Sequence, residues 1–284
     1  MARRTEVTAR QARLGTELRK LREGAGLMGR EAAALLGTDA GRLSQMESGV
    51  VGVSEARVRE LAAHCSCTDA ELIDALVAMA TDRTRGWWEE FRGLLPPPFL
   101  DLAELEHHAL YRLDVEFLNV PGLLQTEDYA RGLFSYRVPE LPWPATELRV
   151  KHRMRRKAVI EGPGAVSYKA VIHEAALRIR VGDRTGARIQ LLRILELSEA
   201  DHITVRVIPF DVDGFGGAWA TMMYTGGPVP KLDTVVRDVT ANGTAFVDSE
   251  AQLEAFRTLF RKVEAASLEP ERSRDFIHNL AKEL

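Results

Sequence analysis

The chain has 284 residues, a length typical of two domains. It is 45% hydrophobic and 28% charged, which is ordinary for a globular protein with a packed core. The net charge of −3 excludes a uniformly basic protein that coats nucleic acid, so any DNA-binding surface must be local.

The sequence contains no segment that suggests a membrane or an export route. No apolar run approaches the roughly 18 residues that span a bilayer. The basic N-terminus is not followed by the apolar segment of a signal peptide. We therefore expect a cytoplasmic protein without membrane contact.

The first part of the chain reads as successive helices with short breaks. Apolar residues at helical spacing occur in five stretches, which end at or near Gly24, Gly37, Gly49, His64 and Ala80. Thr38 and Ser54 are the expected N-caps of the third and fourth helices. The sequence predicts an all-helical domain over 1–82 and a linker over 83–98, where three successive prolines and a Gly-Trp-Trp run interrupt any continuous helix.

Beyond the linker, strand and helix patterns alternate. Period-two patterns predict strands at 111–118, 167–173, 203–209, 218–224, 235–239 and 244–247. Helical patterns occupy 127–135, 146–160, 174–180, 185–198, 249–266 and 270–283. We expect a mixed α+β domain over 99–284, so the whole chain is α+β with a helical N-terminal domain.

The clearest functional motif lies at 30–49, where two short helices are expected to meet at a large angle. Ala33 is small enough for a close helix approach, and Gly37 provides the break. Leu43 and Met46 are expected to face the core. The remaining side chains of the second helix then face outward, namely Ala40, Gly41, Arg42, Ser44 and Gln45.

This stretch resembles the Xre/Cro type of helix-turn-helix, through the pattern Ala33-x-x-Leu36-Gly37 followed by Ser44-x-x-Glu47-x-Gly49. The resemblance implies binding of double-stranded DNA, with Ala40, Gly41, Arg42 and Gln45 facing the major groove. Arg42 is expected to bond guanine and Gln45 adenine, while Ser44 lies near a phosphate and Glu47 is structural. Thr38, just before this helix, completes the expected DNA-facing set. The family usually carries longer polar residues where this chain has Ala40 and Gly41, so DNA shape is expected to carry more of the recognition.

Charge supports this interpretation only in part. Residues 1–30 carry eight basic and three acidic residues, an excess of 8 − 3 = 5, and phosphate contacts are expected from Arg19, Arg22, Arg30 and the basic N-terminal arm. Residues 31–80 carry three basic and eight acidic residues, which disfavours tight binding by one copy. We therefore expect a homodimer that presents two recognition helices.

The second domain resembles DUF5753, the domain that follows this helix-turn-helix in many actinobacterial, Scr1 antitoxin-like regulators. The most specific match is the run from Val120 to Thr126, Val-Pro-Gly-Leu-Leu-Gln-Thr. The sequence departs from the family at Lys157 and at 236–238. A structural role for the matching residues is one interpretation. The other is a ligand or partner groove formed by Gln125, Thr126, Tyr129, Arg153, Arg156 and Glu174.

The partner of the second domain stays open at this point. The resemblance implies a regulator that senses a small effector, or an antitoxin-like protein that neutralises a small DUF397-type protein. A basic run over 149–157 is either a solvated helix face or a groove for an acidic ligand, partner or DNA.

An enzymatic second domain is the least favoured interpretation. The chain has no P-loop, no zinc-protease motif and no nucleophile elbow. The glycine loop 213–217 reads as a turn or lid, and His173-Glu174 as the start of a helix. Cys65 and Cys67 are too close together on a helix to act as a metal pair, so we expect no metal and no cofactor.

Overall fold

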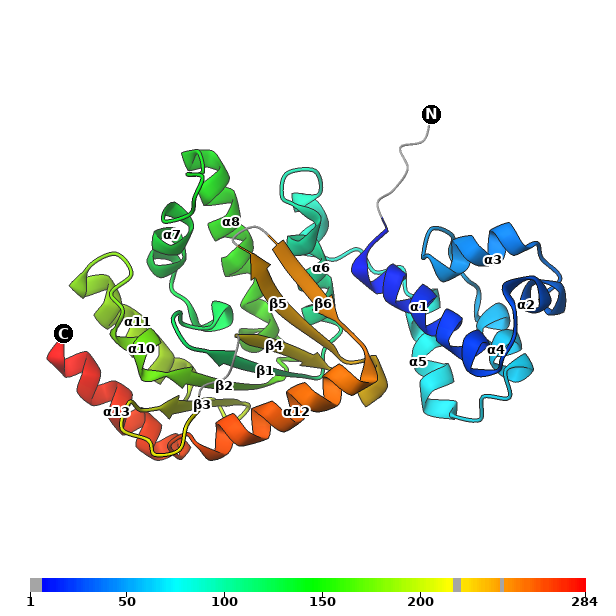
Figure 1. The fold of residues 1–284 in the computed structure, drawn as a ribbon. Coiled ribbons are helices and arrows are strands. Elements are labelled where there is room, and N and C mark those ends of the chain that lie inside the picture. Colours follow the sequence, from blue (N-terminus) through cyan, green and yellow to red (C-terminus); the bar gives the residue numbers. More distant parts are fainter. Residues whose placement is uncertain (1–6, 217–220, 241–242) are drawn as a thin grey trace. The chain divides into compact units, whose positions relative to one another are not determined.

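The computed structural model describes residues 7–216, 221–240 and 243–284. The chain forms two compact units (Figure 1). The first comprises Met1–Glu90 and Pro97–Leu105, and the second comprises Phe91–Pro96 and Glu106–Leu284.

The first unit is helical, as predicted. Its helices are α1 (Ala9–Gly24), α2 (Gly29–Leu35), α3 (Ala40–Glu47), α4 (Glu55–His64), α5 (Ala70–Thr81), most of the 3-10 helix η1 (Trp87–Phe91) and most of α6 (Pro97–His107). Polar caps fix where the helices begin. Thr8 and Gln11 cap the start of α1 reciprocally, and Ser54 and Asp69 accept backbone N–H groups at the starts of α4 and α5.

The second unit is built on one six-stranded sheet of order β3-β2-β1-β4-β5-β6. Its strands are β1 (Tyr111–Glu116), β2 (Ser167–His173), β3 (Ile203–Ile208), β4 (Met222–Gly226), β5 (Thr234–Thr240) and β6 (Gly243–Val247). The strands β3, β2 and β1 are parallel, and β1, β4, β5 and β6 are antiparallel. The predicted α+β class is confirmed, and the chain combines it with the helical first unit.

Helices cover both faces of this sheet (Figure 1). They are α7 (Glu127–Ser135), α8 (Trp143–Arg156), α9 (Ala158–Glu161), α10 (Glu174–Arg178), α11 (Arg184–Leu197), α12 (Glu250–Ala265) and α13 (Pro270–Glu283), with the short 3-10 turns η2 (Gly122–Leu124) and η3 (Pro230–Leu232). Alternation along β2 divides the core, since Ala170 and Ile172 face α7, α11 and α13, whereas Val171 faces α12. The start of the strand predicted at 218–224 lies outside the described residues, and β4 begins at Met222.

The boundary between the units differs from the predicted linker at 83–98. Trp88 and Phe91 are buried, each with an exposed fraction of 2%, so this segment packs instead of linking. Pro97 and Pro98 form the first turn of α6, where proline is tolerated because those N–H groups have no helical partner. Most of α6 belongs to the first unit, although the second domain was expected to begin at 99.

Candidate nucleic-acid interface

The helices α2 and α3 pack against each other around a tight turn, in the order expected of a helix-turn-helix. Gly37 adopts φ +57°, a left-handed conformation that glycine reaches without a side-chain penalty. Ala33 is buried, as its small size predicted. The two helices are therefore joined as the 30–49 motif requires.

Helix α3 divides cleanly into a buried and an exposed face. Leu43 and Met46 are buried in the unit, and the predicted outward set is exposed, namely Ala40, Gly41, Arg42, Ser44 and Gln45. The predicted cap, Thr38, is wrong. Asp39 caps the helix, because its Oδ1 accepts the Arg42 N–H at 2.8 Å.

Glu47 joins α3 to α1 through two arginines. Its Oε1 and Oε2 accept from Nε and Nη2 of Arg22 at 2.6 and 3.0 Å, and Arg19 Nε donates to Oε2 at 3.2 Å. Arg22 also donates to the Leu27 carbonyl, and its hydrogen bond to Glu47 raises its pKa. Glu47 and Arg22 are buried, whereas about half of the Arg19 side chain is exposed.

The contacts of Arg22 favour a positioning role over the expected phosphate contact. Its guanidinium is engaged by a carboxylate and a carbonyl inside the fold. Arg19 lies at the edge of the same cluster with an exposed side chain. Arg30, in the first turn of α2, is exposed.

Gly15, which no pattern in the sequence singles out, and Gly49, the last residue of the motif, bring α1 against the end of α3. A Cβ on Gly15 would stand 2.5 Å from the Glu47 carbonyl oxygen. At Gly49, φ is +73° and a Cβ would stand 2.7 Å from the Gln11 carbonyl oxygen. The final glycine of the Ser-x-x-Glu-x-Gly pattern thus permits close backbone contact, which fixes the exposed face of α3.

In the second unit, the residues expected to form a ligand groove bond mainly to one another and to the backbone. Gln125 is buried, and its Nε2 donates to the Val120 carbonyl at 2.7 Å. Tyr129 Oη accepts the Val120 N–H at 3.0 Å, and burial raises the pKa of Tyr129 to about 12. Thr126 caps α7, and its own N–H donates to Gln190 at 2.7 Å.

The other three candidates are also engaged inside the fold. Arg153 Nη1 donates to Gln125 Oε1 at 2.6 Å. Glu174 begins α10, where its Oε1 accepts from Arg178 and its Oε2 from the Phe210 N–H. The structure therefore favours the structural interpretation of all these residues over a shared ligand groove.

Arg156 belongs to a buried charge cluster. Its Nε and Nη2 donate to Glu106 at 2.8 and 2.6 Å, and Arg112 bridges Glu106 and Asp114. The Tyr168 hydroxyl donates to Asp114 at 2.8 Å. Burial raises the pKa of Glu106, but the guanidinium groups of Arg156 and Arg112 outweigh it, so the net shift is downward and the carboxylate stays ionised.

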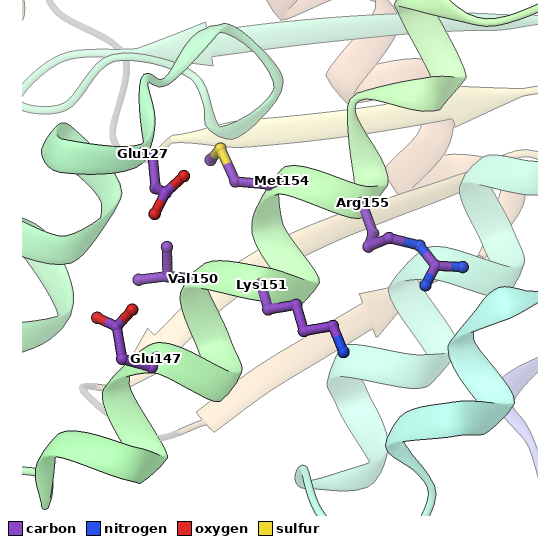
Figure 2. Close-up of a pocket in the computed structure, with 6 residues that line it drawn as sticks. All are labelled: Glu127, Glu147, Val150, Lys151, Met154 and Arg155. Atoms are coloured by element: carbon purple, nitrogen blue, oxygen red, sulfur yellow. The ribbon is translucent and has the colours of Figure 1, made fainter.

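A hollow of about 360 Å³ lies elsewhere, between α7 and α8. Figure 2 shows its lining residues, namely Glu127, Glu147, Val150, Lys151, Met154 and Arg155; the two glutamates lie on one side with Val150 and Met154 beside them, and Lys151 and Arg155 point to the other side. None of the six expected groove residues lines this hollow. The basic run over 149–157 is accordingly split, since Arg156 is buried in the charge cluster while Lys151 and Arg155 reach the hollow.

The structure offers little that suggests catalysis. Within the described residues, no group of three His, Cys, Asp or Glu side chains could hold a metal ion. The described part of the glycine loop, Asp213–Gly216, is followed by residues outside the description, Gly217 among them. His173 caps α10 through Nδ1, which accepts the Ala175 N–H at 3.1 Å. None of the described helices is long and apolar enough to cross a membrane.

Comparison with known families agrees with both units. A family described as a helix-turn-helix domain matches residues 13–76, and one described as a domain of unknown function, DUF5753, matches residues 99–279. No curated protein and no solved structure matches the chain. The first match, with the exposed face of α3, supports a DNA-binding regulator. The chain belongs to the DUF5753 family and carries a helix-turn-helix domain before it.

Proposed function

We propose that this protein is a sequence-specific transcriptional regulator that inserts α3 into the major groove of its operator. The observation that carries the proposal is the exposed set Ala40, Gly41, Arg42, Ser44 and Gln45, on a helix held by buried Leu43 and Met46. Arg42 contacts a guanine and Gln45 an adenine. Arg19, Arg30 and Ser44 contact phosphates, which sets the register.

The small side chains at Ala40 and Gly41 shape this recognition. They leave two of the outward positions of α3 without a long polar group, so direct base contacts fall to Arg42 and Gln45. Few base contacts per copy favour a homodimer, because two half-sites double the specific contacts. Sequence-dependent DNA shape supplies the rest of the specificity.

The test is binding to DNA upstream of the protein's own gene, or to sites selected from a random duplex library, measured by fluorescence anisotropy at several salt concentrations. The double variant Arg42→Ala/Gln45→Ala should lose about two orders of magnitude in specific affinity, from two base contacts of about 1–3 kcal/mol each. Arg188→Ala, an exposed arginine on α11, is the matched control. Specific binding unchanged in the double variant contradicts the assignment of α3.

For the second domain we propose regulation by binding and not by catalysis. Its occupant is either a small effector or a small protein of the DUF397 type. The internal pairing of Gln125, Arg153 and Glu174 argues for contacts on the outer surface over a site at these residues. Native mass spectrometry of the purified chain and co-purification with neighbouring gene products separate a bound metabolite from a bound protein.

A further inference from the structure

Asp39, the residue that caps α3, is an exposed carboxylate of which only one oxygen is used by the fold. Its Oδ1 accepts the Arg42 N–H at 2.8 Å. Its other oxygen, Oδ2, has no hydrogen-bond or ion-pair partner among the described residues. The capping bond therefore holds the side chain in place and leaves the second oxygen for a donor from outside the chain.

Asp39 lies in line with the two residues of α3 proposed to read bases. Asp39, Arg42 and Gln45 follow one another at a spacing of three residues, and all three are exposed. Residues three positions apart are neighbours on one side of a helix. Although Arg42 comes three positions after the carboxylate, the two side chains form no ion pair within the part of the chain that the structure describes. The carboxylate and the guanidinium therefore do not neutralise each other.

The small residues of the first turn of α3 leave room for this carboxylate. A Cβ at Gly41 would stand 3.1 Å from Oδ1 of Asp39, which is closer than an ordinary van der Waals contact. Ala40, next to Asp39, adds only a methyl group. Longer side chains at these two positions would crowd the carboxylate, so the sequence of the turn keeps Asp39 uncovered.

A carboxylate oxygen on a recognition helix selects among bases because it can only accept hydrogen bonds. In the major groove, cytosine presents the N4 amino group, which donates, whereas guanine and thymine present only acceptors. Adenine donates through N6, but its N7 is an acceptor beside it, which repels a carboxylate. Phosphate oxygens repel it as well. A carboxylate in this place therefore favours cytosine while it lowers the affinity for DNA in general.

We propose that Asp39 is a specificity-determining residue, whose Oδ2 accepts a hydrogen bond from the N4 amino group of a cytosine in the operator. Asp39 and Arg42 are separated by about 4.5 Å along the axis of α3, which is between one and two base steps of about 3.4 Å. The cytosine therefore lies one or two base pairs from the guanine that Arg42 contacts. The inference rests on the proposed function, since it requires α3 to lie in the major groove.

The test is a competition between duplexes, measured by fluorescence anisotropy with the full chain. Sites are first selected from a random duplex library, and the position whose preference Arg42→Ala abolishes marks the guanine. Wild type should lose about tenfold in affinity when the nearby C·G pair is replaced, because a charge-assisted hydrogen bond is lost. Asp39→Asn should lose less than about threefold on the same replacement, because its neutral amide accepts more weakly and also donates.

A second readout depends on charge alone. Asp39→Asn should bind duplexes without the site more tightly than wild type at low salt, because a negative charge is removed beside the phosphates. Asparagine and serine both serve as N-caps, so Asp39→Asn and Asp39→Ser should keep the melting temperature of wild type and lose the cytosine preference alike.

Asp183→Asn is the matched control, since Asp183 is an exposed cap at the start of α11 whose Oδ1 accepts the Gly186 N–H at 2.7 Å. It should change neither base preference nor non-specific affinity. Selected sites without a C·G pair within two positions of the guanine, or full discrimination retained in Asp39→Asn, overturn the proposal. If Arg42→Ala/Gln45→Ala still loses specific binding, the proposed function stands without Asp39. If that variant also binds as wild type does, α3 itself is not the recognition helix.

Discussion

The helices α3 and α8 are both rich in polar residues, but their side chains have opposite environments. On α3, Arg42 and Gln45 are exposed, and the carboxylate at the helix end, Glu47, is occupied by Arg22. On α8, Arg153 and Arg156 turn inward to Gln125 and Glu106. A basic residue on a helix is therefore less available to a partner where neighbouring elements bury it against an acceptor, as they do for Arg153 and Arg156.

The largest expected effect concerns the buried arginines in and near α8. Glu106→Gln leaves Arg112 and Arg156 buried without their shared carboxylate, which should cost the second unit about 3–5 kcal/mol of unfolding free energy. Urea denaturation followed by far-UV circular dichroism measures this loss. Glu140→Gln, at an exposed position before α8, should stay within about 0.5 kcal/mol of wild type. Equal stability of the two variants would remove the buried cluster as a major stabilising element.

The next prediction separates positioning from DNA contact within the first unit. Arg22→Ala should lower the unfolding free energy by about 2–3 kcal/mol, because it leaves the Glu47 carboxylate buried without its main donor. Arg42→Ala should leave stability within about 0.5 kcal/mol and weaken specific DNA binding. Thermal denaturation and anisotropy on the same samples test both. If Arg22→Ala keeps its stability and loses only DNA affinity, Arg22 is a phosphate contact after all.

A smaller effect distinguishes phosphate contacts from base contacts among the exposed residues of α2 and α3. Arg30→Ala should weaken binding to specific and non-specific duplexes alike and reduce the slope of log K against log salt by about one. Arg42→Ala should instead weaken mainly the specific complex. A salt slope that Arg30→Ala leaves unchanged would place α2 away from the DNA backbone.

The smallest expected effect concerns pH in the second unit. Burial lowers the pKa of His173, against the opposing charge of Glu174, and Nδ1 must be unprotonated to cap α10. The unfolded chain therefore takes up this proton first as the pH falls below about 6.5, and stability declines from there toward the lowered folded pKa. The loss should stay below about 1 kcal/mol, the usual value of a cap. His173→Asn keeps an acceptor without titrating, so its melting temperature should fall less between pH 7.5 and 5; an unchanged pH dependence contradicts this role.

Much of the fold could be predicted from the sequence because its patterns are local. The helices α7 and α13 and the strand β2 have the predicted bounds, since apolar periodicity, with the Thr126 cap at the start of α7, defines them without tertiary information. Helix α6 was missed, because three prolines suggest a break although proline suits a first helical turn. Asp39, adjacent to Thr38, was passed over as a cap because both residue types serve that role.

The candidate site was predictable where exposure follows from helical periodicity, as for Arg42 and Gln45. It was not predictable where long-range pairing decides the role of a residue. Arg22 pairs with Glu47 across 25 positions and Arg156 with Glu106 across 50, and a single sequence carries no local signal of either pair. Gly15 gave no signal either, because only the approach of Glu47 makes a side chain there impossible.

The assignment of 91–96 to the second unit and 97–105 to the first interleaves the two domains along the chain. No single cut separates them cleanly. A fragment that starts at residue 99, where the family match begins, lacks the buried residues Phe91 and Leu95. A fragment that ends before 97 loses Asp101, whose carboxylate accepts the Ala9 N–H at 2.9 Å at the start of α1. A DNA-binding module transferred from one protein to another would therefore keep both units intact only if residues 91–105 were transferred together with the domains on either side.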